Sequence, residues 1–377
     1  FKVFMSEEAI RSSSEVLNSG YITQGPVVED FENLLTNYFD QNNFTTTNSA
    51  TSAIHLVIHM LKNYGIGDEK IKIENSEDHI ITTPLTCTAT NWPILLNDVN
   101  IRWVDVDEQN CNINLDDLET KLNKNTKALM LVHWGGYPID LNRLKEIQDN
   151  FYKKHGFKFI IIEDCAHAFG ANLNGQKIGT FGNVSTFSFQ AIKHLTTVDG
   201  GGVIFPNKED TDRAKLLRWY GIDRNENRKD FRCEEDISEI GFKFHMNDVN
   251  ASIGISNFEH VKNNLLGKHI ENGNYFTENL KNIDDIDLLN YTEKEVPFWI
   301  YTLKVNNRER FMNKMMDKNI VTSRVHERND IHSSVKKFKT SLPILDKLVE
   351  TMVCIPVGWW VTNEQRDYII DTIKKGW

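Results

Sequence analysis

Residues 157–205, FKFIIIEDCAHAFGANLNGQKIGTFGNVSTFSFQAIKHLTTVDGGGVIF, decide both the fold and the site. An apolar run ends in the acidic pair Glu163-Asp164, and a second β-prone run ends at Ser188 and leads to Lys193. An ionised carboxylate at the end of an apolar strand is costly unless a cation meets it, so the pattern predicts a cationic partner for Asp164. The stretch therefore indicates a site where a carboxylate, a hydroxyl and an amine converge, as a covalently held cofactor requires.

Strand and helix patterns alternate along the chain that leads into that stretch. Short β-prone runs occur at 44–47, 78–84, 101–107, 126–134 and 157–164, with helical apolar spacing between them. Such alternation predicts right-handed βαβ crossovers and a mostly parallel sheet covered on both faces. The predicted fold class is therefore α/β. We expect a three-layer αβα large domain over residues 1–255 and a smaller α+β domain over residues 256–377.

Polar residues follow the carboxyl ends of the predicted strands, where ligands bind in such sheets. Thr83-Pro84, residues 133–137 (HWGGY) and Asp164 all fall there and are expected to line one crevice. The turn from Ser49 to Thr51 follows the first strand and begins a helix, so its N–H groups and hydroxyls suit an anion. Ordinary helix capping explains the same residues, and their spacing leaves both interpretations open.

Composition narrows the class of protein. The formal net charge of −10 disfavours a nucleic-acid-binding protein, which needs a basic surface. No apolar run reaches the roughly 18 residues of a membrane-spanning helix, so no membrane partner is expected. The five cysteines are isolated, which favours reduced thiols in a cytoplasmic protein and no metal site.

Two nucleotide-binding motifs are excluded by the glycine pattern. Gly170 and Gly175 resemble part of a phosphate-binding loop, but Gln176 stands where that motif needs lysine, and no G-x-G-x-x-G occurs. Asn174-Gly175 instead predicts a two-residue hairpin.

Farther along, the charged residues 222–245 predict a mobile loop. Helical spacing over residues 246–280 predicts a helical passage into the smaller domain, with a break near Leu266-Gly267.

The candidate site residues together match the needs of pyridoxal 5′-phosphate. Asp164 offers an acid for a protonated pyridine nitrogen, and Lys193 offers an ε-amine for a Schiff base with an aldehyde. Ser188 and the turn from Ser49 to Thr51 offer donors to a phosphate.

Six stretches carry a resemblance to a known family: TQGPVVEDFE (23–32), SATSAIHL (49–56), VHWGGYPIDL (132–141), IIIEDCAHAFGA (160–171), FSFQAIKHLTTVDGGG (187–202) and LRWYGIDR (217–224). They look like the motifs of the DegT/DnrJ family of pyridoxal-phosphate-dependent nucleotide-sugar aminotransferases. The resemblance runs in order from about Gly25 to the C-terminal helix, and it implies the aspartate aminotransferase fold type, fold type I.

The resemblance also implies a role for each matching residue. Lys193 would be the Schiff-base lysine, Asp164 would pair with the pyridine nitrogen, and His167 would contact the cofactor ring beside its hydroxyl. Ser188 would bind the phosphate together with the Ser49-Ala50-Thr51 turn, where the family more often has Ser-Gly-Thr.

In this family a residue of the neighbouring subunit completes the phosphate site, so the resemblance implies a homodimer with shared sites. The corresponding motif, GFKFHMNDVNAS (241–252), points to His245 or Asn247. The chain departs from the family where an aromatic residue often packs on the cofactor ring. Residues 86–88 are Thr-Cys-Thr, which leaves a small side chain, Trp92 or Trp134 for that role.

The implied reaction is a transamination in two halves. L-glutamate becomes 2-oxoglutarate as the cofactor becomes pyridoxamine phosphate, and a nucleotide-linked keto sugar then receives the amino group. A 4-keto-6-deoxy hexose is the expected substrate, and its amino sugar would serve glycan or polysaccharide biosynthesis.

Two alternatives remain. Sugar dehydratases of the same family, which use pyridoxamine phosphate, carry histidine where this chain has Lys193, and a catalytically inactive cofactor-binding protein is disfavoured by the retained site residues.

Flat rings and cations suit a nucleoside diphosphate, and each candidate for the substrate pocket also has a structural explanation. The candidates are Tyr21, Trp92, Tyr137, Trp219, Arg224, His326 and Arg328.

Overall fold

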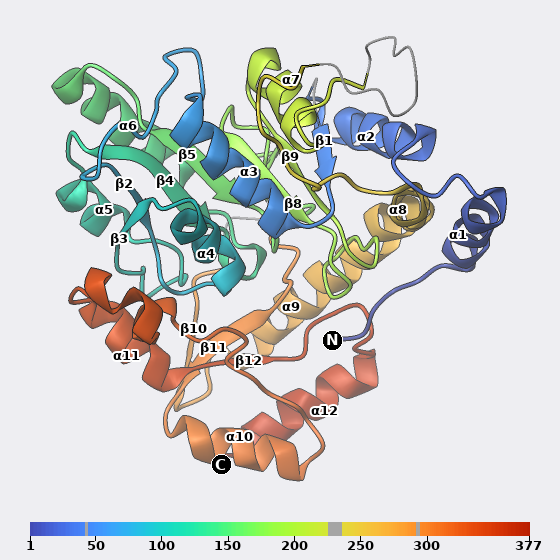
Figure 1. Cartoon of the computed structure of the whole chain (residues 1–377). Helices are drawn as coiled ribbons and strands as arrows, with labels where there is room; N and C mark the ends of the chain where they lie inside the picture. The colour runs from blue at the N-terminus through green and yellow to red at the C-terminus, as the bar shows by residue number, and fades with distance from the viewer. Residues whose placement is uncertain (42–43, 225–235, 292–294) are drawn as a thin grey trace.

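The computed structural model describes residues 1–41, 44–224, 236–291 and 295–377, and within these residues a seven-stranded sheet forms the centre (Figure 1). The strands, in spatial order, are β1 (Phe44–Thr47), β9 (Gly201–Ile204), β8 (Val184–Ser188), β5 (Ile160–Asp164), β4 (Thr126–Val132), β2 (His79–Thr82) and β3 (Asn100–Trp103). Strand β9 pairs antiparallel with β1 and with β8, and the remaining pairs are parallel. The predicted α/β class with a mostly parallel sheet is confirmed.

Helices cover both faces of this sheet because successive strand residues point to opposite sides. Ile80 and Ile162 belong to one core cluster, while their neighbours Ile81 and Ile161 belong to another. Helices α3 (Ala50–Asn63), α4 (Thr88–Leu96) and α7 (Lys208–Leu217) contribute to the first cluster, which extends into the C-terminal helices of the chain. The helices that contribute to the second are α2 (Pro26–Phe39), α5 (Leu115–Lys121), α6 (Leu141–His155) and α8 (Asp248–His260).

Local signals explain several element boundaries. Helix α1 (Glu7–Ser19) begins where the Ser6 side chain accepts from the Ala9 N–H, and it ends at Gly20 in the left-handed conformation. The predicted hairpin joins β6 (Asn172–Leu173) to β7 (Gln176–Lys177). Its turn residues Asn174 and Gly175 have φ values of 54° and 79°, as such a two-residue turn requires.

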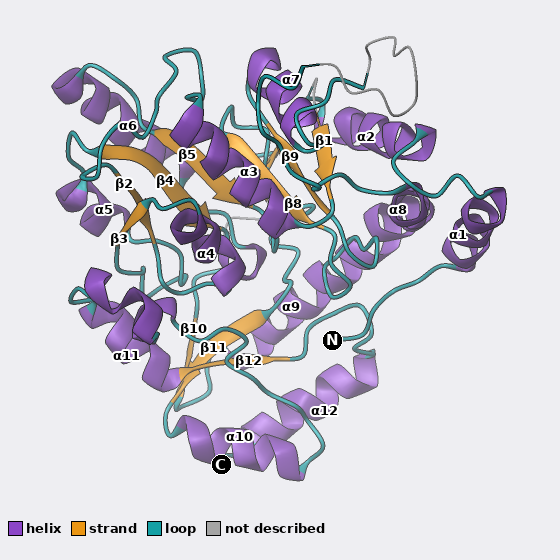
Figure 2. Ribbon diagram, in the orientation of Figure 1, coloured by secondary structure: helices purple, strands orange, loops and turns teal. Residues whose placement is uncertain are grey.

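A second, antiparallel sheet lies in the C-terminal part of the chain and is flanked by helices (Figure 2). Its strands are β10 (Ile286–Leu288), β11 (Tyr301–Val305) and β12 (Met352–Ile355). The helices in this part are α9 (Leu266–Leu280), α10 (Arg308–Asp317), α11 (Pro343–Thr351) and α12 (Asn363–Lys374). Short 3-10 turns lie at Trp134–Gly136, Asn329–Ile331 and Ser333–Phe338.

The prediction of a helix break near Leu266-Gly267 is wrong. Helices α8 and α9 are joined through the π-helical segment Val261–Leu265, so the helical path continues. Leu266 is buried, and a Cβ on Gly170 would lie 2.5 Å from its Cδ1, so tertiary packing outweighs the weak helix propensity of Gly267. Of the predicted mobile loop, residues 225–235 lie outside the described residues.

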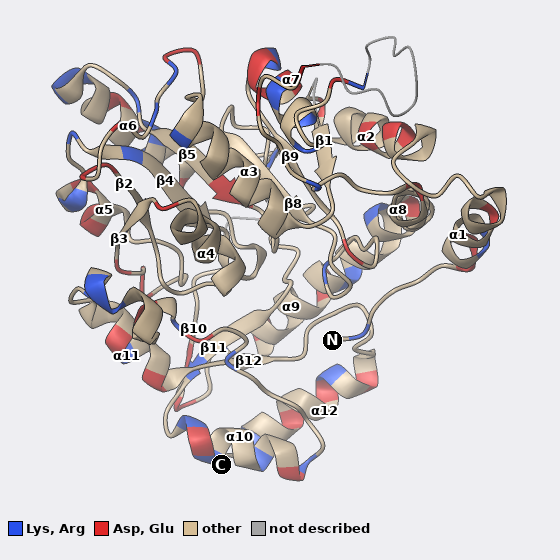
Figure 3. Ribbon diagram, viewed as in Figure 1, with Lys and Arg blue, Asp and Glu red and all other residues tan. Residues whose placement is uncertain are grey.

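Charged residues lie chiefly on helices and outer loops, with both signs interspersed on α10 and α12 (Figure 3). Among the described residues, no helix combines the length and apolar character that crossing a membrane requires.

Candidate active site

The site forms at one edge of the central sheet. Strands β2, β4, β5 and β8 run parallel, so their carboxyl ends share this edge, and the antiparallel strand β9 begins there. Asp164 ends β5 and Ser188 ends β8, while the turn that carries Lys193 follows β8. Chain topology therefore brings the acid, the hydroxyl and the amine of the sequence prediction to the same edge.

Asp164 is buried and Lys193 is half-buried, and the two are close enough for their charges to interact. Asp164 is 5% exposed, and its carboxylate accepts from Thr90 Oγ1 at 2.7 Å and from the Ala166 N–H at 3.0 Å. Burial lowers the pKa of Lys193 to about 8, and the charge of Asp164 opposes this shift. At pH 7 about a tenth of this lysine is therefore the nucleophilic free amine.

His167 is held in one tautomer. The Gly135 N–H donates to its Nδ1 at 3.3 Å, so the ring proton is on Nε2. Burial, with a further effect of Lys193, keeps the pKa of His167 well below its usual value. The side chain is thus a neutral ring whose Nε2–H remains to donate to a bound ligand.

Aromatic side chains from distant parts of the chain surround His167. Trp299 stacks on its ring with centroids 3.8 Å apart, and the His326 ring lies parallel at 5.6 Å. Trp134 meets the same two imidazoles edge-on, at 6.3 Å from His167 and 5.9 Å from His326. Of the two tryptophans proposed to pack against a cofactor ring, Trp134 thus lies in the cluster, whereas Trp92 meets His332 edge-on.

Ser188 and the Ser49–Thr51 turn form a cradle around Gly201. Ser188 is the register partner of Gly201, and a Cβ built on Gly201 would lie 2.2 Å from the backbone N of Ala50. The Ser49 side chain caps α3 by accepting from the Ser52 N–H at 3.1 Å. Capping therefore accounts for the Ser49 side chain, and an anion site at the same helix start stays a prediction.

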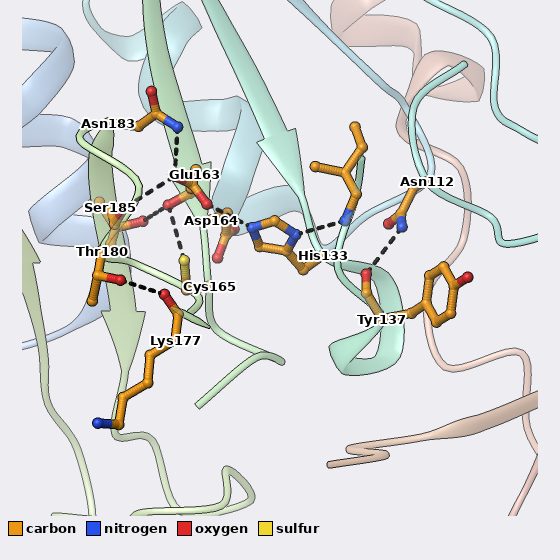
Figure 4. Close-up of polar contacts among 12 residues, drawn as sticks. Asn112, His133, Tyr137, Glu163, Asp164, Cys165, Lys177, Thr180, Asn183 and Ser185 are labelled. Atoms are coloured by element: carbon orange, nitrogen blue, oxygen red, sulfur yellow. Dashed lines mark hydrogen bonds and ion pairs between the residues drawn. The ribbon is translucent and has the colours of Figure 1, made fainter. Parts of the chain in front are cut away.

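A network of buried hydrogen bonds surrounds Glu163, the residue before Asp164 (Figure 4). His133 Nε2 donates to Glu163 Oε2 at 2.8 Å, and the Ile139 N–H donates to His133 Nδ1 at 3.2 Å. Glu163 Oε1 accepts from Asn183 at 2.8 Å and from Ser185 at 3.4 Å. Each donor in this network has an acceptor, so the buried carboxylate is satisfied without a cation.

The same network includes a group of possible metal ligands, since atoms of His133, Glu163 and Cys165 lie within 4.8 Å of one another. Both nitrogens of His133 are already hydrogen-bonded, and burial raises the pKa of the Cys165 thiol well above its usual value. A metal would have to displace these bonds and a thiol proton, so the geometry favours a structural role.

Other residues predicted to bind the substrate or the phosphate have contacts outside the cluster around His167. Trp219, Arg224 and His245 form a group of their own, with Trp219 3.6 Å from the His245 ring and 4.4 Å from the Arg224 guanidinium. Asn247 caps α8 by accepting from the Asn250 N–H at 2.9 Å.

Three further candidates differ in exposure. Tyr137 is 5% exposed and packs edge-on against Tyr291 in the core, whereas Tyr21 is 84% exposed. Arg328 forms ion pairs with Asp330 and Asp346.

Sequence reasoning missed Thr90 and Trp299. Thr90 donates to Asp164 across 74 positions of sequence, and Trp299 comes from the segment before β11. No local motif marks either residue. The only available signal was the hydroxyl and aromatic content of the segments around them.

Comparison with known proteins agrees with this geometry. Residues 4–374 match the DegT/DnrJ/EryC1/StrS aminotransferase family. The sugar aminotransferase CalS13 from Micromonospora echinospora has a similar structure, with a TM-score of 0.94, 40% identity, and coverage of 100% of this chain and 99% of that one.

Two relatives have names that describe enzymes of nucleotide-sugar metabolism. The UDP-4-amino-4,6-dideoxy-N-acetyl-beta-L-altrosamine transaminase of Campylobacter jejuni is 30% identical over 72% of this chain and 69% of its own. The GDP-perosamine synthase of Escherichia coli O157:H7 is 28% identical over 96% of this chain and 93% of its own. The chain belongs to the DegT/DnrJ/EryC1/StrS family of pyridoxal-phosphate-dependent sugar aminotransferases.

Proposed function

We propose that this aminotransferase moves the amino group of L-glutamate to a keto-deoxy sugar carried by a nucleoside diphosphate, with pyridoxal phosphate as its cofactor. We take a 4-keto-6-deoxy hexose as the sugar and an amino-deoxy sugar nucleotide as the product. One observation carries this proposal. The half-buried Lys193, whose pKa is lowered to about 8 by desolvation, lies within charge interaction of the buried Asp164 carboxylate, at the sheet edge where helix α3 begins.

The residues present fit the cofactor. Asp164 accepts from neutral donors, Thr90 Oγ1 and the Ala166 N–H, so its charge remains for a protonated pyridine nitrogen. Because Gly201 has no side chain, the Ser49–Thr51 turn approaches β9 closely beside Ser188, and donors from the turn and from Ser188 suit a phosphate.

Bound pyridoxal phosphate supplies an aldehyde that condenses with amines and a ring that accepts electrons from the substrate carbon. The chain's own residues do the rest. Lys193 Nζ, with its lowered pKa, takes a proton from the donor carbon and later returns one to the acceptor. Asp164 would keep the pyridine nitrogen protonated, and the Nε2–H of His167 would be available to donate to the ring hydroxyl.

We also propose that the enzyme works in the cytoplasm as a homodimer whose neighbouring subunit supplies His245 or Asn247 to the phosphate. Burial lowers the pKa of His245 to about 4, so within one chain this ring is a neutral donor. A large domain of residues 1–255 would hold the cofactor, and residues 256–377 would form the smaller domain that includes His326.

The test is to incubate the protein with L-glutamate and a panel of UDP-, GDP- and dTDP-linked keto sugars, and to identify the products by NMR. An amino sugar and 2-oxoglutarate are expected, and Lys193→Ala is expected to form neither. A product that has lost a hydroxyl would indicate the dehydratase alternative. Cofactor absorbance that glutamate leaves unchanged would indicate an inactive binding protein.

A further inference from the structure

Trp299 lies at the centre of side chains that come from distant parts of the chain. Its ring stacks on His167 at an interplanar angle of 15°, and the Nζ of Lys193 lies 3.6 Å from its centroid. The ring of His326 lies nearly parallel, 6.0 Å away. Trp299 is 2% exposed, so its contact with the amine lies inside the protein.

Hydrogen bonds fix Trp299 to the turn that carries the reactive lysine. Its indole N–H donates to the backbone O of Ile192 at 2.9 Å, and the backbone O of Pro297 accepts from His194 Nε2 at 3.0 Å. Ile192 and His194 are the two neighbours of the lysine. The position of the ring is therefore coupled to the position of the amine.

The backbone just before Trp299 is strained. Phe298 has a φ of 36°, a conformation that residues with a side chain rarely adopt. Its carbonyl accepts from His269 Nδ1 at 3.0 Å, and its ring fills the space over Gly273, where a Cβ would come within 2.2 Å. Strain of this kind persists only where the surroundings hold it, and here it sets the direction of the indole ring.

We propose that Trp299 is a positioning residue for Lys193, which it holds by binding the ε-ammonium against the face of its indole ring. An indole face attracts a cation and has little preference for a neutral amine. The ring therefore favours Lys193 in the state in which it carries a proton. The proposal rests on the proposed function only in taking Lys193 as the amine that moves protons.

Other titratable groups also face Lys193, and each acts differently from the ring. They are Asp164 on β5, Cys87 before α4, and the imidazoles of His167, His194 and His326. Burial lowers the pKa of all three imidazoles, which keeps them neutral at pH 7. Asp164, Cys87 and the indole face are then the groups that support the ammonium, while burial opposes it.

The test measures the pKa of Lys193 directly in the apoprotein. Lysine labelled with 13C at Cε gives one NMR signal per lysine, and the signal missing from Lys193→Arg assigns this residue. Trp299→Leu removes the indole face, and its Lys193 pKa is expected to fall by about 0.5 to 1.5 below the parent value. Trp299→Phe keeps an aromatic face and is expected to fall less.

Trp377→Leu is the matched control, because its ring meets Phe311 and its indole N–H donates to the backbone O of Asn306, away from the lysine. It is expected to leave the Lys193 pKa unchanged. A Lys193 pKa in Trp299→Leu that equals or exceeds the parent value overturns the proposal, as does an equal fall in Trp377→Leu.

A second measurement separates this proposal from the proposed function. With L-glutamate deuterated at its α-carbon, Trp299→Leu is expected to show a larger isotope effect on kcat than the parent, because the misplaced amine slows proton transfer. If no nucleotide sugar is aminated by the parent enzyme, the proposed function fails, yet the pKa result in the apoprotein still decides the role of Trp299.

Discussion

Gly201→Ala tests the phosphate cradle at its tightest point. A Cβ at this position would lie 2.2 Å from the backbone N of Ala50 and 2.4 Å from the carbonyl carbon of Ser49. Non-bonded heavy atoms rest about 3.5 Å apart, so the turn at the start of α3 has to move by about 1 Å. The N–H groups that would meet the phosphate move with that turn.

The expected loss follows from the usual cost of adding a methyl group to a packed site, about 1 to 3 kcal/mol. At about 1.4 kcal/mol for each tenfold change, this weakens binding of pyridoxamine phosphate to the apoprotein by about 5- to 150-fold. Pyridoxamine, which has the same ring without the phosphate, is expected to bind Gly201→Ala nearly as it binds the parent. Quenching of tryptophan fluorescence measures both affinities.

Gly202→Ala is the matched control on the same strand. Its methyl group would point to the other face of β9 and meet the Phe44 ring at 2.2 Å, so it disturbs the core and leaves the turn alone. Gly202→Ala is expected to lower the free energy of unfolding without changing the ratio of the affinities for pyridoxamine phosphate and pyridoxamine. A folded Gly201→Ala protein that loses affinity equally for both ligands, or for neither, would refute the reasoning.

Three more predictions concern charge and burial. Since the pKa of Lys193 is lowered to about 8, its neutral fraction at pH 7 exceeds that of an ordinary lysine by about 300-fold. The rate of imine formation between apoprotein and pyridoxal should therefore rise with pH and level off above about pH 8. A rate that continues to rise beyond about pH 10 would contradict this prediction. Glu163→Gln leaves one buried donor unpaired and should lower the free energy of unfolding in urea by about 1 to 3 kcal/mol. Glu15→Gln, at an exposed position, is the control and should leave this free energy almost unchanged. Glu32→Ala leaves the buried guanidinium of Arg218 without its carboxylate partner, and it should lower the free energy of unfolding in urea by about 3 to 5 kcal/mol. A decrease below about 1 kcal/mol would show that water reaches the arginine.

The predicted positions at strand ends follow from general rules of parallel sheets. Asp164 and Ser188 end neighbouring strands, and the apolar runs before them are local signals in the sequence. Once alternation with helices indicates a parallel sheet, their carboxyl ends must share an edge. The helix start at Ser49 was predicted in the same way, from small and hydroxyl residues that follow a strand.

The predicted substrate residues were less well placed because composition says which side chains suit a ligand but not which way they point. His326 joins the cluster around His167, while Arg328, two positions later, is held by Asp330 and Asp346. Tyr137 belongs to a predicted strand-end motif, yet its ring is packed in the core. Such differences depend on how the C-terminal segment folds back on the sheet.

The sequence by itself determined the α/β fold, the family and the residues at strand ends, because periodicity, turn chemistry and motif spacing are local properties of the chain. Only the tertiary structure decided the partners of those residues. Trp299 reaches the carbonyl of Ile192 across 107 positions, and Asn329 reaches Asn91 across 238. Contacts of this range form when the C-terminal segment docks on the sheet edge, and no local pattern encodes that docking.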